Sequence, residues 1–541
     1  MKKNKYLFLV LILSTIPLLY FIFNPLLFHT HDGLVHIPRI AAFYKALADG
    51  QFPVRWAGDL NYGYGMPLFN FIYQVPYFIA SFFVFLGLGL AWSFKITLAL
   101  SFLLSGVFAY LFGQSFFQDS RKAFLFAICY QFFPFRFIEL LVRGSFGEVY
   151  TYTFLPLVLF GLSSTLQKPT RLSIVCTILG TVLLILSHNA VSLLFFVVCT
   201  GFIVFFRKKK VGVVSSVVGL ILGLLVSCFY WLPAIVEHKY TYGDLFMKSL
   251  YTEHFAPFFN FFLPNFTNSS SLQTGGISVW IGLIHTLIIF ISVWMLVQKK
   301  LNGGEKSVAW FGLLCVGVAL FFMQPISRLL WESIALLRQF QFPWRFLAVV
   351  GFGTSLLIVV FIKYVKNQNI YFLPIACIVF STVFYWRPSL GYDKIDEDYY
   401  WNFPLNTTYY GETDVIWSAG PAKTYAKEPV EFVSGKGDIT AYTKKSSIHT
   451  FNVQADVDSY LLDNTQYFPG WKVLVDGKPV SIQFQDVNWR GLITFPVAKG
   501  NHTVRVVFGE SKLRQIADAV SLLGLVVTIL VLYKKPKQMY G

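Results

Sequence analysis

The chain has 541 residues, of which 55% are hydrophobic and only 13% are charged, and its formal net charge is +17. Soluble domains carry roughly 25% charged residues, so this composition excludes an ordinary soluble protein and indicates a membrane protein. The basic residues lie before, between or after apolar runs, as in cytoplasmic loops, so the positive charge does not indicate nucleic-acid binding. These clusters are Lys2, Lys3 and Lys5, residues 207–210 and 299–300, Lys363 and Lys366, and Lys534, Lys535 and Lys537.

Thirteen apolar runs, each of about 17 residues or more, are long enough to cross a bilayer as helices. They cover residues 6–28, 68–90, 96–116, 122–138, 150–166, 172–187, 189–206, 211–231, 277–297, 308–325, 344–362, 370–386 and 516–533. Because both ends of the chain are basic, both termini are expected in the cytoplasm, which requires an even number of crossings. The run 68–90 carries Asn70, Gln74 and Pro76 near its start. We therefore expect it to lie at the outer interface or to re-enter, leaving about twelve transmembrane helices.

The predicted membrane domain covers residues 1–386, and its first long outer loop covers residues 29–67. Apolar residues repeat at helical spacing from Leu34 to Tyr44, which predicts a short amphipathic helix on the membrane surface. Asp32 directly precedes this helix. Two interpretations of Asp32 follow: its side chain caps the helix, or it is a catalytic carboxylate at the outer end of the first transmembrane helix.

Three histidines surround Asp32 in the sequence: His29, His31 and His36. Imidazole and carboxylate groups at this spacing are ligands that a divalent metal ion accepts. Histidines are also common at membrane interfaces. The sequence therefore allows a metal site in this cluster but does not establish one, and His31 is also a candidate substrate-binding residue.

Further candidates lie in later outer segments. Arg143 and Glu148 flank two glycines and form either a turn with a surface ion pair or part of a site. His188 stands in a tight turn between two apolar runs. Arg338 and Arg345 lie among aromatic residues, where they either anchor the chain at the interface or hold a lipid-linked phosphate through their forked donors.

Residues 387–514 change abruptly in composition, with nearly balanced charge, period-two alternation and short turns. This pattern predicts a small antiparallel β-sandwich, which we expect on the extracytoplasmic side. Tyr467, Trp471 and Trp489 are candidates for stacking on sugar rings or for the sandwich core. Residues 515–541 contain the last transmembrane helix and a basic cytoplasmic tail.

Two segments of the chain resemble known families. The stretch HDGLVHIPR…FPVRW…YGYGMPLFNFIYQVPY resembles the N-terminal part of the bacterial membrane proteins called 6-pyruvoyl-tetrahydropterin synthase-related. The stretch YFPGWKVLVDGKPV…RGLITFPVAKGNHTVRVVF resembles the C-terminal domain of YfhO-like membrane proteins. Both groups are similar in layout to the GT-C glycosyltransferases. The name of the first group implies no pterin chemistry here.

The GT-C resemblance implies an interfacial helix after the first outer loop and a catalytic Asp at the end of the first helix, which maps onto Asp32. It also implies a second acid in the next outer loop, which maps onto Glu148. The pattern Phe-x-Phe-Pro-x-Arg-Phe of these families maps onto the segment that contains Arg345, and His188 matches a further family feature. Gly33 stands where the family has a partner acid, and this departure puts a metal-dependent reaction in doubt.

The resulting hypothesis is an inverting glycosyltransferase that moves a sugar from a polyprenyl-phosphate donor to an extracytoplasmic glycan or lipid acceptor. Asp32 would act as general base, and Arg345 with Arg143 or Arg338 would stabilise the departing phosphate, while Glu148 and His188 would orient the reacting groups. Two alternatives remain open: a transporter or flippase for lipid-linked glycans, and a non-catalytic membrane scaffold whose outer domain binds a glycan.

Overall fold

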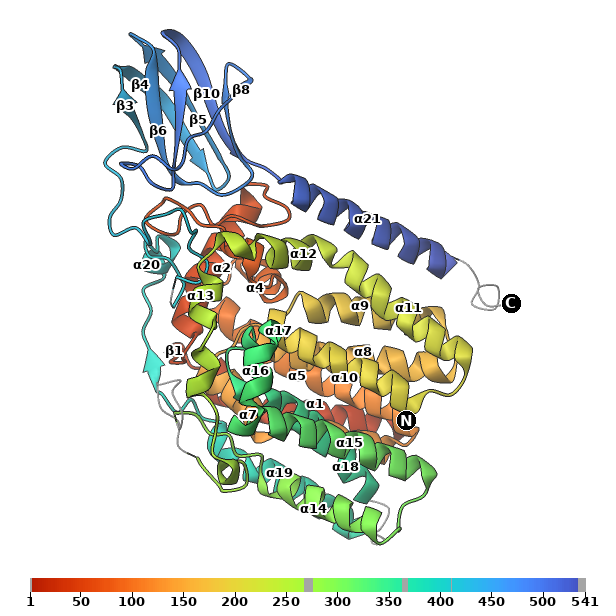
Figure 1. Ribbon diagram of the computed structural model, residues 1–541. Coiled ribbons are helices and arrows are strands. Elements are labelled where there is room, and N and C mark those ends of the chain that lie inside the picture. Colours follow the sequence, from red (N-terminus) through yellow and green to blue (C-terminus); the bar gives the residue numbers. More distant parts are fainter. Residues whose placement is uncertain (1, 267–275, 362–367, 410, 534–541) are drawn as a thin grey trace.

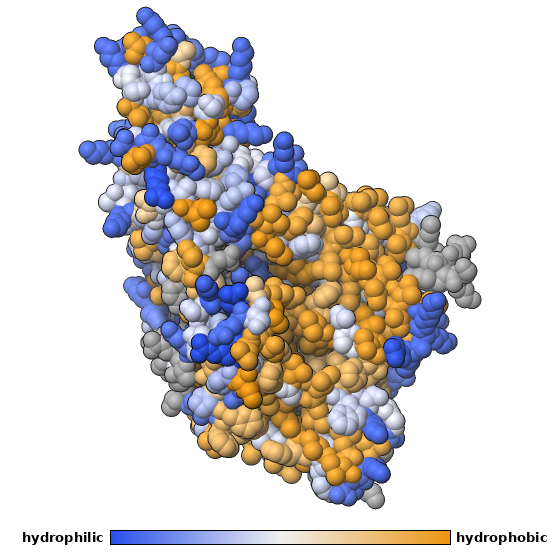
Figure 2. All heavy atoms as spheres, in the orientation of Figure 1, coloured by the Kyte–Doolittle hydropathy of each residue, from blue (hydrophilic) through white to orange (hydrophobic). Residues whose placement is uncertain are grey.

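The computed structural model describes residues 2–266, 276–361, 368–409 and 411–533. Most of this part of the chain consists of helices that lie side by side, and a β-sandwich extends from one end of the bundle (Figure 1). In Figure 2 apolar side chains cover much of the helical part, whereas the sandwich surface is mainly hydrophilic. A polytopic membrane domain that carries a β-domain is therefore confirmed.

The helices of the N-terminal half follow one another with short connections. They are α1 (Lys2–Ile22), α2 (Gly33–Ala48), α3 (Leu68–Phe71), α4 (Val75–Phe85), α5 (Leu90–Phe117), α6 (Ser120–Gln131), α7 (Pro134–Phe137), the π-helix η1 (Ile138–Arg143), α8 (Glu148–Gln167), α9 (Arg171–Ile185), α10 (Asn189–Phe206), α11 (Lys210–Val226) and α12 (Cys228–Val236). The predicted amphipathic helix corresponds to α2, and ten of its residues are buried.

The second half alternates short helices with longer apolar ones. They are η2 (Glu237–Tyr240), α13 (Gly243–Met247), η3 (Leu250–Glu253), η4 (Phe258–Phe261), α14 (Leu283–Val297), α15 (Gly303–Phe322), η5 (Pro325–Ser327), α16 (Arg328–Ser333), α17 (Ala335–Arg338), η6 (Pro343–Phe346), α18 (Leu347–Phe361), α19 (Gln368–Ser381), η8 (Val383–Tyr385), α20 (Glu397–Trp401) and α21 (Lys512–Tyr533). The Ser-rich stretch at residues 269–271 lies outside the described residues.

Seven of the described helices are long and apolar enough to cross a membrane, and two bent helix pairs raise the number to nine. Four shorter apolar helices remain. The predicted run 68–90 is broken into α3 and α4. The 11 residues of α4 span about 16 Å, half of a hydrocarbon core of roughly 30 Å. Twelve crossings result when the other three short helices cross and α4 does not.

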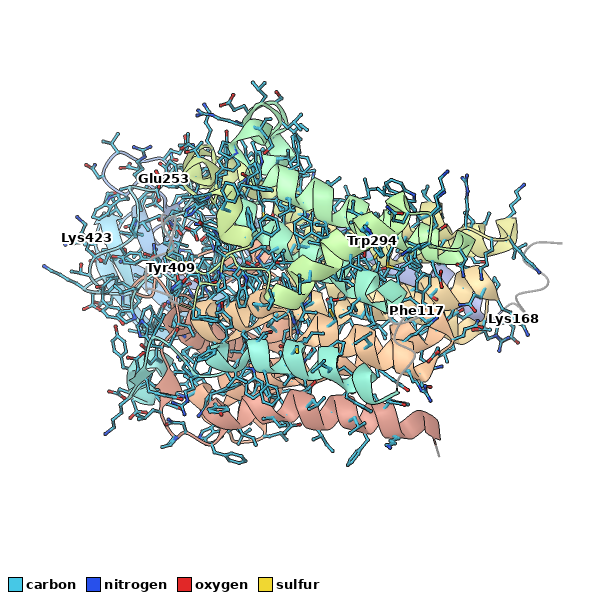
Figure 3. The ribbon with its side chains drawn as sticks, turned by 90° about the horizontal axis from the view of Figure 1, so that it is seen from below. Phe117, Lys168, Glu253, Trp294, Tyr409 and Lys423 are labelled. Carbon is cyan, nitrogen blue, oxygen red and sulfur yellow. The ribbon has the colours of Figure 1, made fainter. Side chains whose placement is uncertain are left out.

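The beginning of α1 and the end of α21 lie at the same end of the helix bundle, away from the sandwich (Figure 1). Viewed from below, Tyr409 and Lys423 lie at the sandwich end, and Phe117 and Lys168 lie toward the opposite end (Figure 3). This placement agrees with an even number of crossings, while cytoplasmic termini stay a prediction. The basic residues around Lys363 and after Tyr533 lie outside the described residues.

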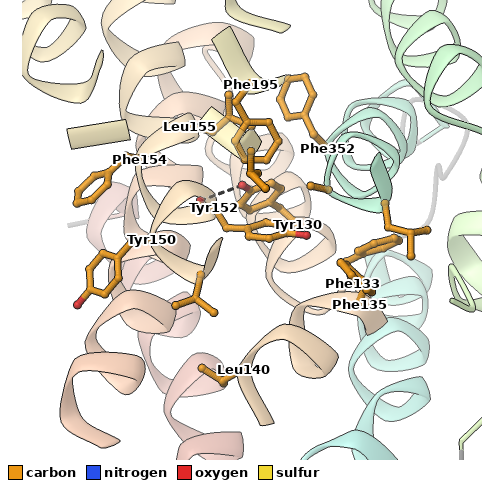
Figure 4. Close-up of a cluster of buried hydrophobic side chains, with 14 of the residues drawn as sticks. Tyr130, Phe133, Phe135, Leu140, Tyr150, Tyr152, Phe154, Leu155, Phe195 and Phe352 are labelled. Atoms are coloured by element: carbon orange, nitrogen blue, oxygen red, sulfur yellow. Dashed lines mark hydrogen bonds between the residues drawn. The ribbon is translucent and has the colours of Figure 1, made fainter. Parts of the chain in front are cut away.

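The interior of the helical domain is rich in aromatic side chains. Tyr130, Tyr152, Phe195 and Phe352 belong to one continuous buried cluster (Figure 4). The Tyr130 hydroxyl donates to the backbone carbonyl of Tyr152 at 2.9 Å, so this buried polar group is satisfied inside the apolar interior. Such packing gives the rigid frame on which the outer segments are held.

The β-domain consists of two antiparallel sheets. One sheet has the order β4 (Gly437–Lys445), β5 (Ile448–Ala455), β10 (Gly500–Phe508), β7 (Trp471–Val475), β8 (Lys478–Val480), and the other has the order β3 (Val430–Ser434), β6 (Ser459–Gln466), β9 (Leu492–Val497). Apolar side chains of both sheets form one core, which confirms the predicted sandwich. Trp471 is 4% exposed and belongs to that core, and Tyr467 stacks on Phe484 with ring centroids 3.9 Å apart.

The sandwich begins at residue 430, not at the predicted boundary of 387. Residues 387–409 and 411–429 instead run along the end of the helix bundle that faces the sandwich (Figure 1). Their strand β2 (Tyr392–Asp393) pairs with β1 (Leu27–Phe28), and α20 packs on α2. The composition of this connection is polar like that of the sandwich, so the sequence gives no signal for the boundary.

The outer loop 51–66 inserts into the base of the sandwich. Trp56 is 1% exposed, and its ring lies 5.3 Å from that of Trp471 and 5.2 Å from that of Phe508. The neighbouring Arg55 is ion-paired with Glu510 at 3.2 Å and with Asp518 at 3.3 Å. The loop therefore joins the membrane domain, the sandwich and the last helix.

Replacing Trp56 with Ala is expected to lower the free energy of unfolding by about 3–5 kcal/mol, because it leaves a large cavity between the loop and the sandwich. Thermal unfolding of the detergent-solubilised protein measures this change. Phe52→Ala in the same loop is the control, since Phe52 is 78% exposed. Equal losses in the two variants would contradict the assignment of Trp56 to the sandwich core.

Candidate active site

Asp32 stands at the junction of α1 and α2, but its side chain makes no capping hydrogen bond to α2. The hydroxyl of Thr30 accepts from the Gly33 N–H at 2.9 Å. The interpretation of Asp32 as a helix cap is therefore wrong, and its carboxylate is turned to other partners.

The segment around Asp32 is held beside the end of the π-helix η1 by backbone hydrogen bonds. His31 N donates to Val142 O at 3.0 Å, and Asp32 N donates to Arg143 O at 2.9 Å. Gly144 follows with a φ of +62°, and an added Cβ would collide with the Thr30 side chain. Only glycine fits this close approach, which brings Asp32 and Arg143 together.

Arg143 is the centre of a buried ion-paired cluster. Its Nη1 lies 2.8 Å from both Glu139 Oε2 and Glu148 Oε1, and its Nη2 lies 3.5 Å from Asp32 Oδ2. Arg345 Nη2 contacts the same Glu148 oxygen at 2.9 Å. Asp32 is the most accessible of these side chains at 15%, against 6% or less for the other four.

Arg345 is fixed by its own loop. Its Nη1 donates to Phe340 O at 2.6 Å and to Gln341 Oε1 at 3.1 Å. Phe342 lies under Arg345 at 4.9 Å, and Trp344 lies under Arg143 at 4.5 Å. Aromatic rings on guanidinium faces exclude water and strengthen the neighbouring ion pairs. Both arginines are thus ion-paired with carboxylates. As site residues, the sequence had led us to predict only that they contact a phosphate.

His188 precedes α10, and its Nδ1 accepts from the Val191 N–H at 3.3 Å. The proton of the neutral ring is therefore on Nε2, which lies 3.7 Å from Glu148 Oε1. The ring stacks on Tyr73 with centroids 5.3 Å apart. The pKa of His188 is lowered from its usual 6.5 to about 3. Burial is the largest cause, and the positive charges of the two arginines lower the pKa further. His188 is neutral at pH 7.

This lowered pKa predicts a pH dependence of stability. Because the folded protein resists protonation of His188 and the unfolded chain does not, the stabilisation is complete above about pH 6.5 and is lost as the pH falls toward 3. The slope for one proton is about 1.4 kcal/mol per pH unit. Melting temperatures between pH 7.5 and pH 5 should therefore fall more steeply for the natural chain than for His188→Gln. Equal slopes would show that His188 does not carry the effect.

Two residues of the site, Tyr409 and Glu139, were not among those predicted from the sequence, and Tyr409 had no clear signal there. The hydroxyl oxygen of Tyr409, in the connection to the sandwich, lies 2.9 Å from Asp32 Oδ1 and 2.8 Å from His31 O, so these two acceptors share its single proton. Burial and the charge of Asp32 raise the pKa of Tyr409, so its hydroxyl stays protonated. Glu139, by contrast, stands four residues before Arg143, and this helical spacing is a signal that sequence reasoning could have used.

Two sets of predicted site residues do not converge on the cluster. Arg338 ends α17, half-buried, and has no ion-pair partner among the described residues. His29 contacts Asp393 at 2.7 Å, and His36 Nδ1 contacts the Tyr77 hydroxyl at 2.8 Å. In the part of the chain that the structure describes, no group of three or more His, Cys, Asp or Glu side chains is arranged to hold a metal ion. Binding of a metal ion at this site stays a prediction from the sequence.

Comparison with known proteins gives one family. Residues 69–389 match the model of a family described as 6-pyruvoyl-tetrahydropterin synthase related domain; membrane protein. No curated protein matches the chain.

Several solved structures of glycosyltransferases are similar in part. The apo oligosaccharyltransferase of Archaeoglobus fulgidus has 11% identity and a TM-score of 0.46 over 73% of this chain and 57% of that one. The arabinofuranosyltransferase AftD from Mycobacteria has 14% identity and a TM-score of 0.44 over 72% of this chain and 27% of that one. ArnT from Cupriavidus metallidurans, bound to undecaprenyl phosphate, has 13% identity and a TM-score of 0.26 over 68% and 79%. The chain thus spans little more than half of the first and about a quarter of the second.

Proposed function

Since the chain belongs to the 6-pyruvoyl-tetrahydropterin synthase related family of membrane proteins, we propose that its outer charged cluster is the active site of a membrane glycosyltransferase. The enzyme would transfer a sugar from a polyprenyl-phosphate donor to an extracytoplasmic glycan or lipid acceptor. The observation that carries the proposal is the convergence of Asp32, Arg143, Glu148 and Arg345, which come from three separate segments of the chain, with Asp32 as the most accessible carboxylate. Both termini would be cytoplasmic, and the sandwich would lie outside.

In the proposed reaction, Asp32 accepts the proton of the acceptor hydroxyl as its oxygen attacks the anomeric carbon of the donor sugar. A bond forms between this oxygen and the anomeric carbon, and the bond to the phosphate oxygen breaks. Its electron pair leaves with the polyprenyl phosphate. A single displacement of this kind inverts the anomeric centre.

The guanidinium of Arg143 is suited to the departing phosphate. Its Nη1 is occupied by Glu139 and Glu148, whereas among the described residues Nη2 has only the long 3.5 Å ion-pair contact to Asp32. A phosphate oxygen beside Asp32 would meet this less committed donor, and charge developing there would be stabilised in a site from which water is largely excluded. Arg345 and Glu148 hold Arg143 in position, and the neutral His188 packs behind Glu148.

The apolar exterior suits a donor that carries a lipid tail. Exposed aliphatic side chains lie on α12, α16 and α17, among them Ile235 at 66%, Leu329 at 74% and Leu336 at 53%. In Figure 2 the molecular surface is hollowed between α12 and the α16–α17 segment. A polyprenyl chain would lie against such a surface without leaving the hydrocarbon phase.

Profiling of lipid-linked intermediates and surface glycans tests the proposal. A deletion strain is expected to accumulate a polyprenyl-phosphate sugar and to lose one sugar from a surface glycan or lipid, and the natural chain should restore both. If the deletion strain has the same lipid-linked intermediates and surface glycans as the strain with the natural chain, the proposal is wrong. A flippase would give the same accumulation in cells, but it would transfer no sugar in detergent, where no bilayer has to be crossed.

A further inference from the structure

The connection between the membrane domain and the sandwich crosses the candidate active site. We call residues 402–409 and 411–416 of this connection the strap. Leu405 O accepts from the Asn61 N–H at 3.2 Å. Asp414 O accepts from the Tyr242 N–H at 3.0 Å. The strap is thus fixed both before and after Tyr409 by backbone hydrogen bonds to two other loops.

The strap also reaches the buried face of α2. Arg39, which is 7% exposed, donates from Nε to the Thr407 hydroxyl at 3.0 Å and from Nη2 to the Thr407 carbonyl. Thr407 is itself 3% exposed. The backbone two residues before Tyr409 is therefore tightly held, and this sets where the Tyr409 side chain can reach.

Tyr409 meets the site through its hydroxyl group. The residue as a whole is 51% exposed, while its hydroxyl oxygen lies 2.9 Å from Asp32 Oδ1. A half-exposed ring on a fixed backbone can rotate away without disturbing the strap. The hydroxyl stands toward Asp32 as an alcohol would stand toward a general base just before proton transfer.

We propose that Tyr409 is a gating residue whose hydroxyl occupies the acceptor-hydroxyl position on Asp32 and excludes water from it until the acceptor displaces the ring. This inference rests on the proposed role of Asp32 as general base. Its consequence concerns the donor: if water reached Asp32, it could attack the anomeric carbon, its proton would pass to Asp32, and the electron pair of the broken bond would leave with the phosphate. The gate thereby protects a lipid-linked sugar from hydrolysis.

Chemical labelling of Asp32 tests the gate without any substrate. The purified full chain in detergent is treated with a water-soluble carbodiimide and glycine ethyl ester, and modification of the Asp32 peptide is followed by mass spectrometry. Tyr409→Phe and Tyr409→Ala are expected to increase the labelling rate at Asp32 several-fold. Tyr392→Phe is the matched control, because it removes a phenol hydroxyl from the same connection that donates to Tyr20 O at 3.1 Å, away from the site. Melting temperatures verify that all variants are folded.

A second measurement follows release of sugar from a short-chain polyprenyl-phosphate sugar in the absence of acceptor. Hydrolysis several-fold faster in Tyr409→Ala than in the natural chain or in Tyr392→Phe supports the gate. Unchanged labelling of Asp32 in both Tyr409 variants overturns it, whatever the activity. Increased labelling without hydrolysis by any variant, and without transfer by the natural chain, retains Tyr409 as a cover of Asp32 but rejects the glycosyltransferase proposal.

Discussion

Replacing Asp32 with Asn is expected to lower the rate of sugar transfer by about 10²- to 10⁴-fold, the range that a positioned general base contributes. The amide has the same size and still accepts the hydrogen bond of Tyr409, but it cannot accept the proton of the acceptor. The fold should tolerate the change, since Arg143 keeps its two closer carboxylates, Glu139 and Glu148. Transfer from a polyprenyl-phosphate sugar to acceptors in membrane extracts measures the effect.

Asp59→Asn is the control for this experiment. Asp59 lies in the same outer loop and pairs with Lys45 at 2.8 Å, but 48% of its side chain is exposed and it is not part of the cluster. Activity close to that of the natural chain is expected. If Asp32→Asn at normal abundance retains full transfer, Asp32 is not the base and the proposed mechanism fails.

Replacing Glu148 with Gln should cause the largest loss of stability among single changes in the site. Glu148 is 2% exposed and contacts two guanidinium groups, those of Arg143 and Arg345. Without its charge the two cations face each other with less compensation in a buried environment. Removing one partner of a buried ion pair costs about 3–5 kcal/mol. Sugar transfer should fall as well, because Arg143 also positions Asp32.

Melting temperatures in detergent give the stability change, and Glu332→Gln is the matched control. Glu332 also pairs with an arginine, Arg328, at 2.7 Å, but the two side chains are 45% and 62% exposed. Exposed pairs contribute about 0–1 kcal/mol, so little change is expected there. Similar changes in melting temperature for Glu148→Gln and Glu332→Gln would show that the cluster around Glu148 does not stabilise the fold.

Much of the fold followed from patterns local in the sequence. The apolar runs predicted the helices, because a lipid-facing helix needs about 20 apolar residues, and the break at Asn70 and Gln74 predicted that the run 68–90 is not a simple span. The alternating segments 449–453, 460–463, 471–475, 491–495 and 503–508 correspond to β5, β6, β7, β9 and β10. The alternation did not predict β3, β4 or β8; most residues of β4 are exposed, so that strand alternates weakly.

The site was predictable only in part. Candidate residues at loop positions could be named from their charge, and the local pair Arg143 and Glu148 could be proposed, but the partners that are distant in the chain could not. Arg345 and Glu148 are 197 residues apart, and Tyr409 and Asp32 are 377 residues apart. The capping interpretation of Asp32 failed for the same reason: a local rule was applied to a side chain whose partners are Arg143 and Tyr409.

Trp56 in the base of the sandwich has a consequence for biogenesis. Its pocket is formed by Trp471 and Phe508, which the ribosome synthesises more than 400 residues later. At 5–20 residues per second the loop waits roughly 20 to 80 seconds after it emerges before its partners exist. During that interval an indole side chain and the Arg55 cation remain unsheltered at the membrane surface. Truncation within the sandwich should therefore leave the membrane domain a target for quality-control proteases and should not release it as an independent enzyme.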